Sequence, residues 1–527
     1  MKMNNIKIVC CLVLSMAITG LSNKIIAQNQ NDSIKTITNS ISEDYTLQQN
    51  LWMNTVNATG LSIDTIEDYG HLFFAESYKD SKYKTTYNPD KQTVYGMNAY
   101  GYKSLDKIFL QGGFSYYRSD EDNIDWSLQM DPERVCPVIL ADSIGGDWKK
   151  DYYKLNMNAA TIPVFGFIRF GVGIDYNVSS GGRDNDPRPK ATVKDLSIRP
   201  AISFDLNEKN NLGFSYLYGD YRQDIEVMNK YGVGGSTTYK ILGLALKEKP
   251  ITEPSIKYRI DRWENGVAIQ YGHRGNKMSY ITEFKYKLLT EKGIDNPYKS
   301  TEDLEEGIIH STPDEDYKYA ENEYGFYGAL SIKGNNLHLV KVNADYYDGK
   351  IYNMSTQQVE LKNNKLDASV AYALFTAPTN TDKRSKFLFN VHYKNSENEN
   401  LYYAVQTIEK INFTTSYEKA LILSGKRFSF DLKAQYSHNL NSDLNIDPQS
   451  DFIEPETDIT DPYVIYNYNY LTSNYITGGV GIKYYGTFKS KTNYYVGLKG
   501  ERLQVIKSSQ FEDEGITSVS LNIGVLF

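Results

Sequence analysis

The chain has 527 residues, and its composition excludes several classes of protein. Tyrosine supplies 45 residues and aromatic residues make up 13% of the chain, whereas cysteine supplies only 3. The mean hydropathy is −0.51, and the only apolar run of membrane-helix character lies at the N-terminus, which excludes a helical membrane protein. Two of the three cysteines fall in that run, which excludes a disulfide scaffold. A net charge of −8 without a basic block argues against nucleic acid as a partner.

Residues 1–27 are predicted to be a cleaved secretory signal peptide. Lys2 and Lys7 precede a short apolar run, and Ala27 is expected to be the last residue before cleavage. The run is too short and wrongly flanked for a membrane-spanning helix. Cleavage would leave Cys136 without a partner for an internal disulfide. The protein is therefore expected to leave the cytoplasm.

Residues 28–68 are predicted to be a lead-in or small plug, opening with a flexible stretch at 28–44, and residues 69–527 carry a two-residue period. At 196–206 the apolar residues are Leu196, Ile198, Pro200, Ile202, Phe204 and Leu206, and the residues between them are Ser197, Arg199, Ala201, Ser203 and Asp205. A helix would need apolar residues three and four apart, whereas strict alternation places one set on each face of a strand. Residues 69–527 are therefore predicted to be all-β.

Three features favour a transmembrane barrel over a soluble β-sandwich. The alternating runs are commonly 11 to 14 residues long, and a strand that crosses a bilayer needs roughly nine to eleven. Many runs carry tyrosines near their ends, as at Tyr116-Tyr117 and Tyr494-Tyr495, which is typical of the two aromatic girdles of a barrel. Short and long connections alternate. The short ones are 104–106, 207–211 and 334–336, and the long polar ones are 119–150, 291–320 and 441–470.

The last strand sets the orientation of the others. Val519, Leu521, Ile523, Val525 and Phe527 share one face, and Ser518, Ser520 and Asn522 share the other. If this strand ends in the periplasm, every long connection falls outside the cell. Up to twenty candidate runs, weakest between 237 and 273, predict an up-and-down antiparallel barrel of about 18 strands, within a range of 16 to 20. Short periplasmic turns and long extracellular loops are expected.

The terminal Phe527 resembles the C-terminal assembly signal of bacterial outer-membrane barrels. It closes a strand with five apolar residues on one face. The alternative is ordinary packing in the last strand of a soluble sheet. The resemblance implies a place in the outer membrane, contact with membrane lipids and lipopolysaccharide, and the barrel-assembly machinery as a partner during biogenesis.

Two segments carry a finer resemblance. Residues 52–61 precede the first strand, and residues 181–190 form an external loop. Together they resemble an uncharacterised family of Bacteroidota-type outer-membrane β-barrels of unknown function, over essentially the whole mature chain. Asn57, Gly60 and Leu61 are also similar to the Asn-Pro-Ala-Gly-Leu start of the long-chain fatty-acid transporter barrels, although the residues at 58 and 59 depart from it. The alternative is a glycine-containing turn into the first strand.

The segment before the first strand is expected to narrow the lumen. About 40 residues are too few for the globular plug of a TonB-type receptor, so no TonB-type coupling is expected. Trp52 and Leu61 are costly to leave exposed, and a segment without a core of its own is expected to pack inside the barrel. Its plug candidates are Trp52, Asn57, Gly60 and Leu61. The inward polar residues have mixed sign and would line either a wet channel or a filled lumen; the lumen candidates are Arg199, Asp205, Asp431 and Lys433.

No catalytic or metal-binding motif is recognised, and no cofactor is expected. The six histidines are scattered singly, and His392 and His438 are assigned to lumen-facing positions. The acidic stretches 301–323 and 441–461 are interpreted as solvated loops, with loose Ca²⁺ binding as a hypothesis. The expected function is a passive channel or facilitator for a small solute. The alternatives are a surface-binding or scaffold barrel with a filled lumen, and an outer-membrane hydrolase whose site is assembled from several strands.

Overall fold

The computed structural model describes most of the chain from residue 40 onward. The described residues are 40–64, 66–134, 136–228, 238–244, 246–247, 255–295, 297, 314–354, 358–377, 380, 382–401, 404–446, 460–488 and 492–527. The predicted signal peptide lies outside them, as do residues 301–313 and 447–459 of the acidic stretches. The signal-peptide and Ca²⁺ hypotheses therefore stay predictions.

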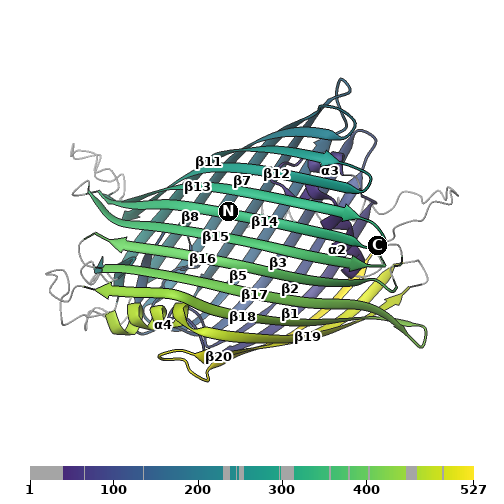
Figure 1. The fold of residues 1–527 in the computed structure, drawn as a ribbon. Coiled ribbons are helices and arrows are strands. Elements are labelled where there is room, and N and C mark those ends of the chain that lie inside the picture. The colour runs from purple at the N-terminus through teal and green to yellow at the C-terminus, as the bar shows by residue number, and fades with distance from the viewer. Residues whose placement is uncertain are drawn as a thin grey trace, which may run out of the picture. The chain divides into compact units, whose positions relative to one another are not determined.

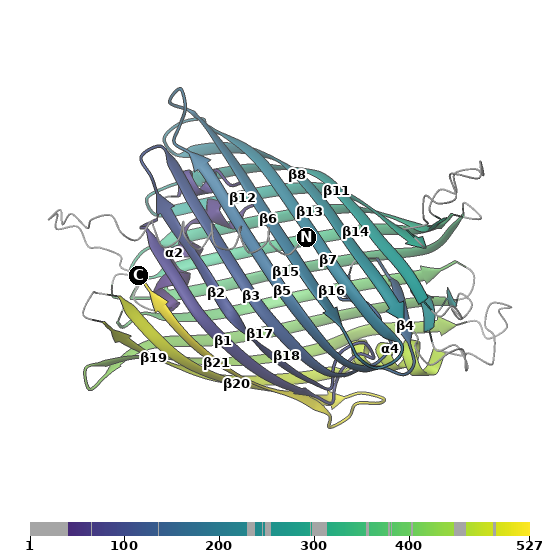
Figure 2. The ribbon, with the colours of Figure 1, turned by 180° about the vertical axis from the view of Figure 1, so that it is seen from behind.

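Within the described residues, eighteen antiparallel strands form one sheet that closes on itself (Figures 1 and 2). Each strand pairs with the next one of the sheet along the chain, and β21 pairs with β1. The strands are β1 (Tyr69–Ser81), β2 (Lys91–Ser104), β3 (Ile108–Ile124), β5 (Gly146–Thr161), β6 (Ile168–Gly182), β7 (Arg188–Asp205), β8 (Asn210–Met228), β11 (Ser255–Arg274), β12 (Met278–Asp295), β13 (Asp314–Lys333), β14 (Leu337–Asn353), β15 (Val359–Thr376), β16 (Ser385–Asn400), β17 (Ala404–Leu423), β18 (Lys426–Ile446), β19 (Asn474–Thr487), β20 (Asn493–Lys507) and β21 (Gly515–Leu526).

The closed up-and-down barrel confirms the predicted fold class and the expected number of strands. Among the described residues, three short strands form a separate sheet: β4 (Val138–Asp142), β9 (Thr238–Leu242) and β10 (Leu246–Lys247). Both β9 and β10 lie in the connection between β8 and β11, where the alternation is weakest. The excess of candidate runs over barrel strands arises in part there.

The connections sort into two ends of the barrel as predicted. The turns 105–107, 206–209, 334–336 and 424–425 are short and lie at the end that holds the C-terminus, which we call periplasmic. The long connections lie at the other, extracellular end, together with the π-helical η4 (Thr460–Ile465) and the helix α4 (Tyr466–Thr472) (Figure 1). The strands are longer than predicted, and β18 has 21 residues. Since roughly nine to eleven residues cross a bilayer, such strands continue beyond it.

Exposed apolar side chains cover the outer face of the barrel. Val480 is 61% exposed, Leu432 is 55% exposed, and Leu521 and Ile523 of the last strand are also exposed. An aqueous protein does not normally expose so large an apolar surface. The alternation therefore places an apolar belt toward lipid and the polar residues toward the lumen.

Among the described residues, no helix is long and apolar enough to cross a membrane.

One predicted orientation is wrong. His438 lies on the outward register of β18 with Phe430, Leu432 and Tyr436, and its ring stacks on that of Tyr436 with centroids 5.9 Å apart. It has the same parity as these apolar residues, so it cannot face the lumen. His392 lies on the inward register of β16, where Nε2 contacts a carboxylate oxygen of Asp367.

The last residue completes the ring of backbone hydrogen bonds. The Phe527 N–H donates to the Gly70 carbonyl at 2.9 Å, and the Gly70 N–H donates to the Phe527 carbonyl at 2.7 Å. The Phe527 ring lies directly over Gly70, since a Cβ at that glycine would be 2.2 Å from a ring carbon. Phe527 is nevertheless 53% exposed on the outer face. Its side chain therefore remains accessible while its backbone closes the barrel.

Replacement of Phe527 by alanine should impair insertion into the outer membrane while leaving export intact. The backbone hydrogen bonds to Gly70 do not need the ring, so the inserted barrel should keep its fold. Recognition by the assembly machinery should be weaker, because the exposed ring is absent. Heat-dependent gel mobility of outer-membrane fractions measures the folded, inserted form. A normal level of that form in Phe527→Ala would show that the ring acts only in packing.

An arginine at Leu521 should destabilise the barrel far more than one at Ser520. Leu521 faces lipid, where an arginine costs about 2–4 kcal/mol near the midplane, whereas Ser520 faces the lumen. Urea unfolding of the refolded variants in lipid vesicles gives the two free energies of unfolding. Equal losses would contradict the assignment of faces. Ser203, also on the lumen face, is fully buried and is therefore unsuitable as the mild control.

Candidate functional site in the lumen

The N-terminal segment lies inside the periplasmic end of the barrel. It comprises α2 (Ser40–Gln49), the 3₁₀-helix η1 (Leu51–Asn54) and the four-residue α3 (Gly60–Ile63), and we call residues 40–64 the plug segment. In Figures 1 and 2, α2 lies at the end that holds the C-terminus. The apolar side chains of η1 and α2 pack against inward residues near the periplasmic ends of β12 to β15, namely Ile281, Ala329, Leu337, Leu339, Ala373 and Phe375.

Glycines in the barrel wall make room for Trp52, which is only 1% exposed. A Cβ at Gly272 would lie 2.3 Å from the indole Nε1, and one at Gly213 would lie 3.0 Å from a ring carbon. Gly60 is close-packed within the plug segment, because its Cβ would lie 2.6 Å from the Trp52 carbonyl oxygen. The backbone N–H of Trp52 donates to a carboxylate oxygen of Asp64 at 2.9 Å. Burial raises the pKa of Asp64, and this hydrogen bond opposes the shift.

Asn57 attaches the plug segment to a buried polar network. Its Nδ2 donates to Gln270 Oε1 at 2.9 Å, and Gln270 Nε2 donates to Glu283 Oε2 at 2.9 Å. The same Glu283 oxygen accepts the Val56 N–H at 3.0 Å. Within the plug segment, Asn57 Oδ1 accepts from the N–H of Thr59 at 3.0 Å and from its hydroxyl at 2.6 Å. The Asn57 side chain thus stabilises the turn at residues 57–59 and also binds this turn to the barrel wall.

Ionic and carbonyl contacts hold the two ends of the plug segment. Lys386 Nζ lies 2.6 Å from a carboxylate oxygen of Asp44 in α2. At the other end, Arg274 Nη1 donates to the Ile63 carbonyl at 2.6 Å, and Leu61 packs with aromatic residues near the periplasmic ends of β1 to β3. The plug segment therefore reaches across several sides of the barrel wall.

A cavity of about 240 Å³ lies between the plug segment and the wall. The plug contributes an apolar side that includes Met53, Val56 and Leu61, and the wall contributes Gln111, Asn158 and Arg199. A second cavity of about 250 Å³ shares Gln111. The arrangement suits a small solute that has both apolar and hydrogen-bonding groups. Of the residues predicted from sequence, Asn57, Leu61 and Arg199 meet here.

The other predicted lumen residues lie elsewhere. Asp205 is at the periplasmic end of β7, where it contacts Arg169. On β18, the Asp431 carboxylate occupies the space over Gly481, and Lys433 Nζ lies 3.4 Å from Glu501. Arg199 is paired with Asp175 and donates to Ser197 at 3.1 Å. The four candidates are therefore divided between two regions of the wall and do not form one site.

The connection between β3 and β5 folds into the extracellular end of the barrel. This connection was expected to be a long polar loop, but Leu128, Cys136 and Leu140 are fully buried in a core inside the barrel that also includes Tyr258 and Ile260. Burial raises the pKa of the Cys136 thiol well above its usual value, so the thiol stays protonated. The correction has a sequence signal: the apolar run from 138 to 141 has no place in a solvated loop.

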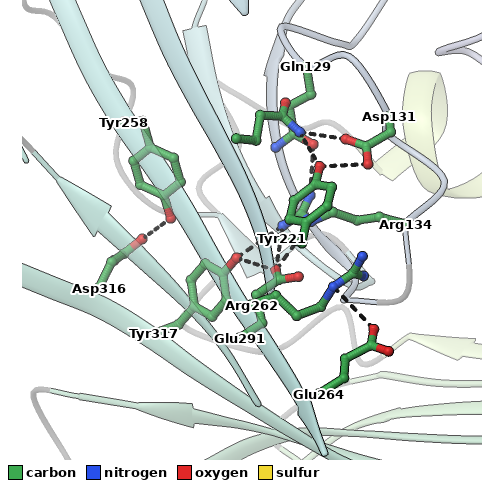
Figure 3. Close-up of polar contacts among 11 residues, drawn as sticks. Gln129, Asp131, Arg134, Tyr221, Tyr258, Arg262, Glu264, Glu291, Asp316 and Tyr317 are labelled. Atoms are coloured by element: carbon green, nitrogen blue, oxygen red, sulfur yellow. Dashed lines mark hydrogen bonds and ion pairs between the residues drawn. The ribbon is translucent and has the colours of Figure 1, made fainter. Parts of the chain in front are cut away.

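A buried polar cluster fastens this connection to the wall (Figure 3). Arg134 lies 2.9 Å from Glu291, and both side chains are essentially inaccessible, at 1% and 0% exposure. Arg134 also donates to the Tyr317 hydroxyl at 3.0 Å. Asp131 accepts from the Tyr221 hydroxyl at 2.6 Å; burial raises the pKa of Asp131, and Arg134 opposes the shift. We call these five residues the extracellular clamp.

Sequence reasoning missed the partners of the plug and of the clamp. Gln270 and Glu283 are inward polar residues like many others in alternating strands, and no spacing singles them out. Gly213 and Gly272 give no signal either, because their role depends on where Trp52 lies. Among the described residues, no group of three or more His, Cys, Asp or Glu side chains is placed to hold a metal ion.

Replacement of Trp52 by alanine should release the plug segment without unfolding the barrel. Removal of a buried tryptophan costs about 3–5 kcal/mol, and here the loss falls on contacts between the plug and the wall. Hydrogen exchange should become faster across residues 40–64 and stay unchanged in the strands. Met53→Ala, at a half-buried neighbour, should have a much smaller effect. Exchange at the wild-type rate in Trp52→Ala would show that Trp52 does not anchor the segment.

Comparisons with solved structures give only distant similarities. In solved structures the chain is similar to CdiB from Acinetobacter baumannii (TM-score 0.36, 9% identity, 86% of this chain and 60% of that chain). It is also similar to a FadL homologue from Pseudomonas aeruginosa (TM-score 0.32, 10% identity, 89% and 91%) and to a mutant of the ferric enterobactin receptor PfeA from the same organism (TM-score 0.39, 6% identity, 87% and 80%). Likenesses at this level carry no inference about function. The match to CdiB covers less than two thirds of the length of CdiB.

A search of curated proteins found no match. A family described as a family of unknown function, DUF6850, matches residues 58–527. This range begins within the plug segment and includes every strand of the barrel. The chain therefore belongs to this family, as the resemblance to an uncharacterised barrel family led us to expect.

Proposed function

We propose that the protein is an outer-membrane facilitator through which a small solute passes when the plug segment leaves its position. The observation that carries the proposal is the packing of the plug segment against glycines of the barrel wall. Residues 40–64 enter the lumen, and Trp52 occupies a recess that Gly213 and Gly272 leave in the wall. Because residues 40–64 precede the first strand, they can leave this recess without breaking the backbone hydrogen bonds between the strands of the barrel.

The polar wall behind the plug supports passage of a solute rather than a dry core. Arg199, Asn158 and Gln111 line the cavity beside the plug. Lys285 and Lys287 form ion pairs with Glu323 at 2.5 and 2.7 Å and remain partly accessible. Charged groups of both signs allow a hydrated path and do not select strongly for one sign of charge.

The extracellular clamp supports a second candidate, a scaffold barrel with a filled lumen. Its buried Arg134–Glu291 pair and the surrounding apolar core lie inside the extracellular end, where they could block passage. In that case the surface formed by the long connections would bind a partner and no solute would cross. The two candidates differ in one measurable property, the flux through the barrel.

A valine at Gly272 should raise the flux of small solutes through reconstituted vesicles. Its side chain would occupy the position of the Trp52 indole and displace the plug segment, while the strand itself accepts a β-branched residue. Deletion of residues 40–64 should raise the flux at least as much. Gly478→Val is the matched control, because Gly478 faces outward and no atom lies within 4 Å of its Cβ position.

Liposome swelling or planar-bilayer conductance measures the flux. Wild-type flux in both the deletion and Gly272→Val, with folded barrels, would contradict the facilitator and leave the scaffold. Raised flux in Gly478→Val as well would show that the barrel leaks for a reason unrelated to the plug.

A further inference from the structure

The outer face of β17 to β21 has a hollow that no side chain fills. Gly478 and Gly500 face outward, and no atom lies within 4 Å of the position that a Cβ would take at either residue. Ala434 is the outward neighbour of Gly478 on β18. The three small residues leave a hollow of about 640 Å³. On the remainder of this belt, larger apolar side chains cover the backbone.

Two rows of outward residues border the hollow. The register aligns Tyr417, Leu432, Val480, Gly500 and Val519 in one row. It aligns Thr415, Ala434, Gly478, Arg502 and Thr517 in the next row toward the extracellular end. The first row is mainly apolar, whereas the second has a threonine hydroxyl at each end and a cation, Arg502, beside Thr517. The row beyond it consists of the exposed Phe413, Tyr436 and Ile476 together with Gln504, so the hollow lies just below the extracellular aromatic edge of the belt on this side.

Arg502 is the first charged outward residue along β20. The outward residues before it are Tyr494, Val496, Leu498 and Gly500, and those after it are Gln504 and the exposed Ile506. Its guanidinium donates to Thr517 Oγ1 at 2.6 Å and to Gln504 Oε1 at 3.1 Å. In the part of the chain that the structure describes, no carboxylate forms an ion pair with it. By contrast, the outward Arg222 of β8 is paired with Asp261 at 2.7 Å.

We infer that this hollow binds an acyl chain of a phosphorylated lipid of the outer leaflet, and that Arg502 binds the phosphate. The chain would lie over Gly478 and Gly500, where it would contact Leu432 and Val480. Arg502 retains unused N–H groups and its full charge, and guanidinium binds phosphate through paired, charge-assisted hydrogen bonds. Its place on the extracellular half of β20 selects the outer leaflet.

The site has nothing to do with the plug segment, because it lies on the other face of the sheet. It adds a specific lipid-binding site on the outer face of the barrel to the proposed function. An arginine on the lipid-facing register costs less near the interface than at the midplane. A phosphate at that level compensates its charge, which accounts for an arginine directly above an apolar hollow.

The test is lipid binding by the purified full-length barrel in detergent micelles, measured by native mass spectrometry. The probe is lipid A with both phosphates, compared with dephosphorylated lipid A. We expect the wild-type protein to retain the phosphorylated form and Arg502→Gln to bind it about ten- to a hundredfold more weakly, as expected for loss of a charge-assisted hydrogen bond. Arg222→Gln, which removes an outward arginine already paired with Asp261, should leave binding unchanged.

A second variant tests the hollow itself. Gly500→Leu would fill it with a side chain that suits the apolar belt, so the barrel should fold and keep its heat-dependent gel shift. We expect it to weaken binding of the phosphorylated lipid at least tenfold with Arg502 intact. Equal binding by wild-type, Arg502→Gln and Gly500→Leu proteins, or equal binding of the two forms of lipid A, would overturn the inference. None of these outcomes depends on solute flux, so failure here leaves the facilitator proposal standing.

Discussion

The whole structure depends on the closure of one sheet. In a bilayer no water satisfies backbone N–H and C=O groups, so a sheet can cross it only if the last strand pairs with the first. Here β21 meets β1 over eleven paired residues, from Ser81 with Ile516 to His71 with Leu526. The carbonyl and N–H of Phe527 extend this ladder to Gly70. Once the ring is closed, each residue has only two directions available, toward lipid or toward the lumen.

Within the described residues, a closed ring of eighteen strands encloses a wide lumen. Different parts of the chain enter the two ends of this lumen. The periplasmic end holds a segment that precedes the barrel in sequence and packs against glycines of the wall. The extracellular end holds a connection between two barrel strands, joined covalently at both sides and fastened by the clamp. The middle contains charged pairs such as Lys287 with Glu323. The ends are thus filled by apolar packing and the middle by groups that water can also solvate.

The fold was predictable because its signal is repeated in every strand. Alternation at 196–206 or at 518–527 fixes faces and direction together, and an error in one run leaves the others intact. The one wrong assignment of a face, that of His438, was made because histidine is polar. His438 lies two residues from the outward Tyr436 on the same strand, and this register places it on the outer face. The site was much less predictable. Trp52 and Asn57 stood out as costly or motif-like residues, but Gln270 and Gly272 act only through three-dimensional neighbours that no local pattern records.

The difference between the two ends indicates which of the two fillings costs less free energy to displace. Removal of one partner from a buried pair such as Arg134 and Glu291 costs about 3–5 kcal/mol, since the other charge stays buried alone. The connection that carries Arg134 also contributes to a continuous apolar core and cannot leave it without exposing Leu128 and Leu140. The plug segment buries Tyr45, Leu51, Trp52, Leu61 and Ile63, but its polar anchor Asn57 is neutral, so water can replace its hydrogen bond to Gln270. Its ion pair between Lys386 and Asp44 is partly accessible, at 20% and 28% exposure. Withdrawal of the plug exposes fewer buried charges than withdrawal of the clamp. Under the facilitator proposal, the plug segment is therefore the part of the lumen filling that a moderate change in free energy would displace first.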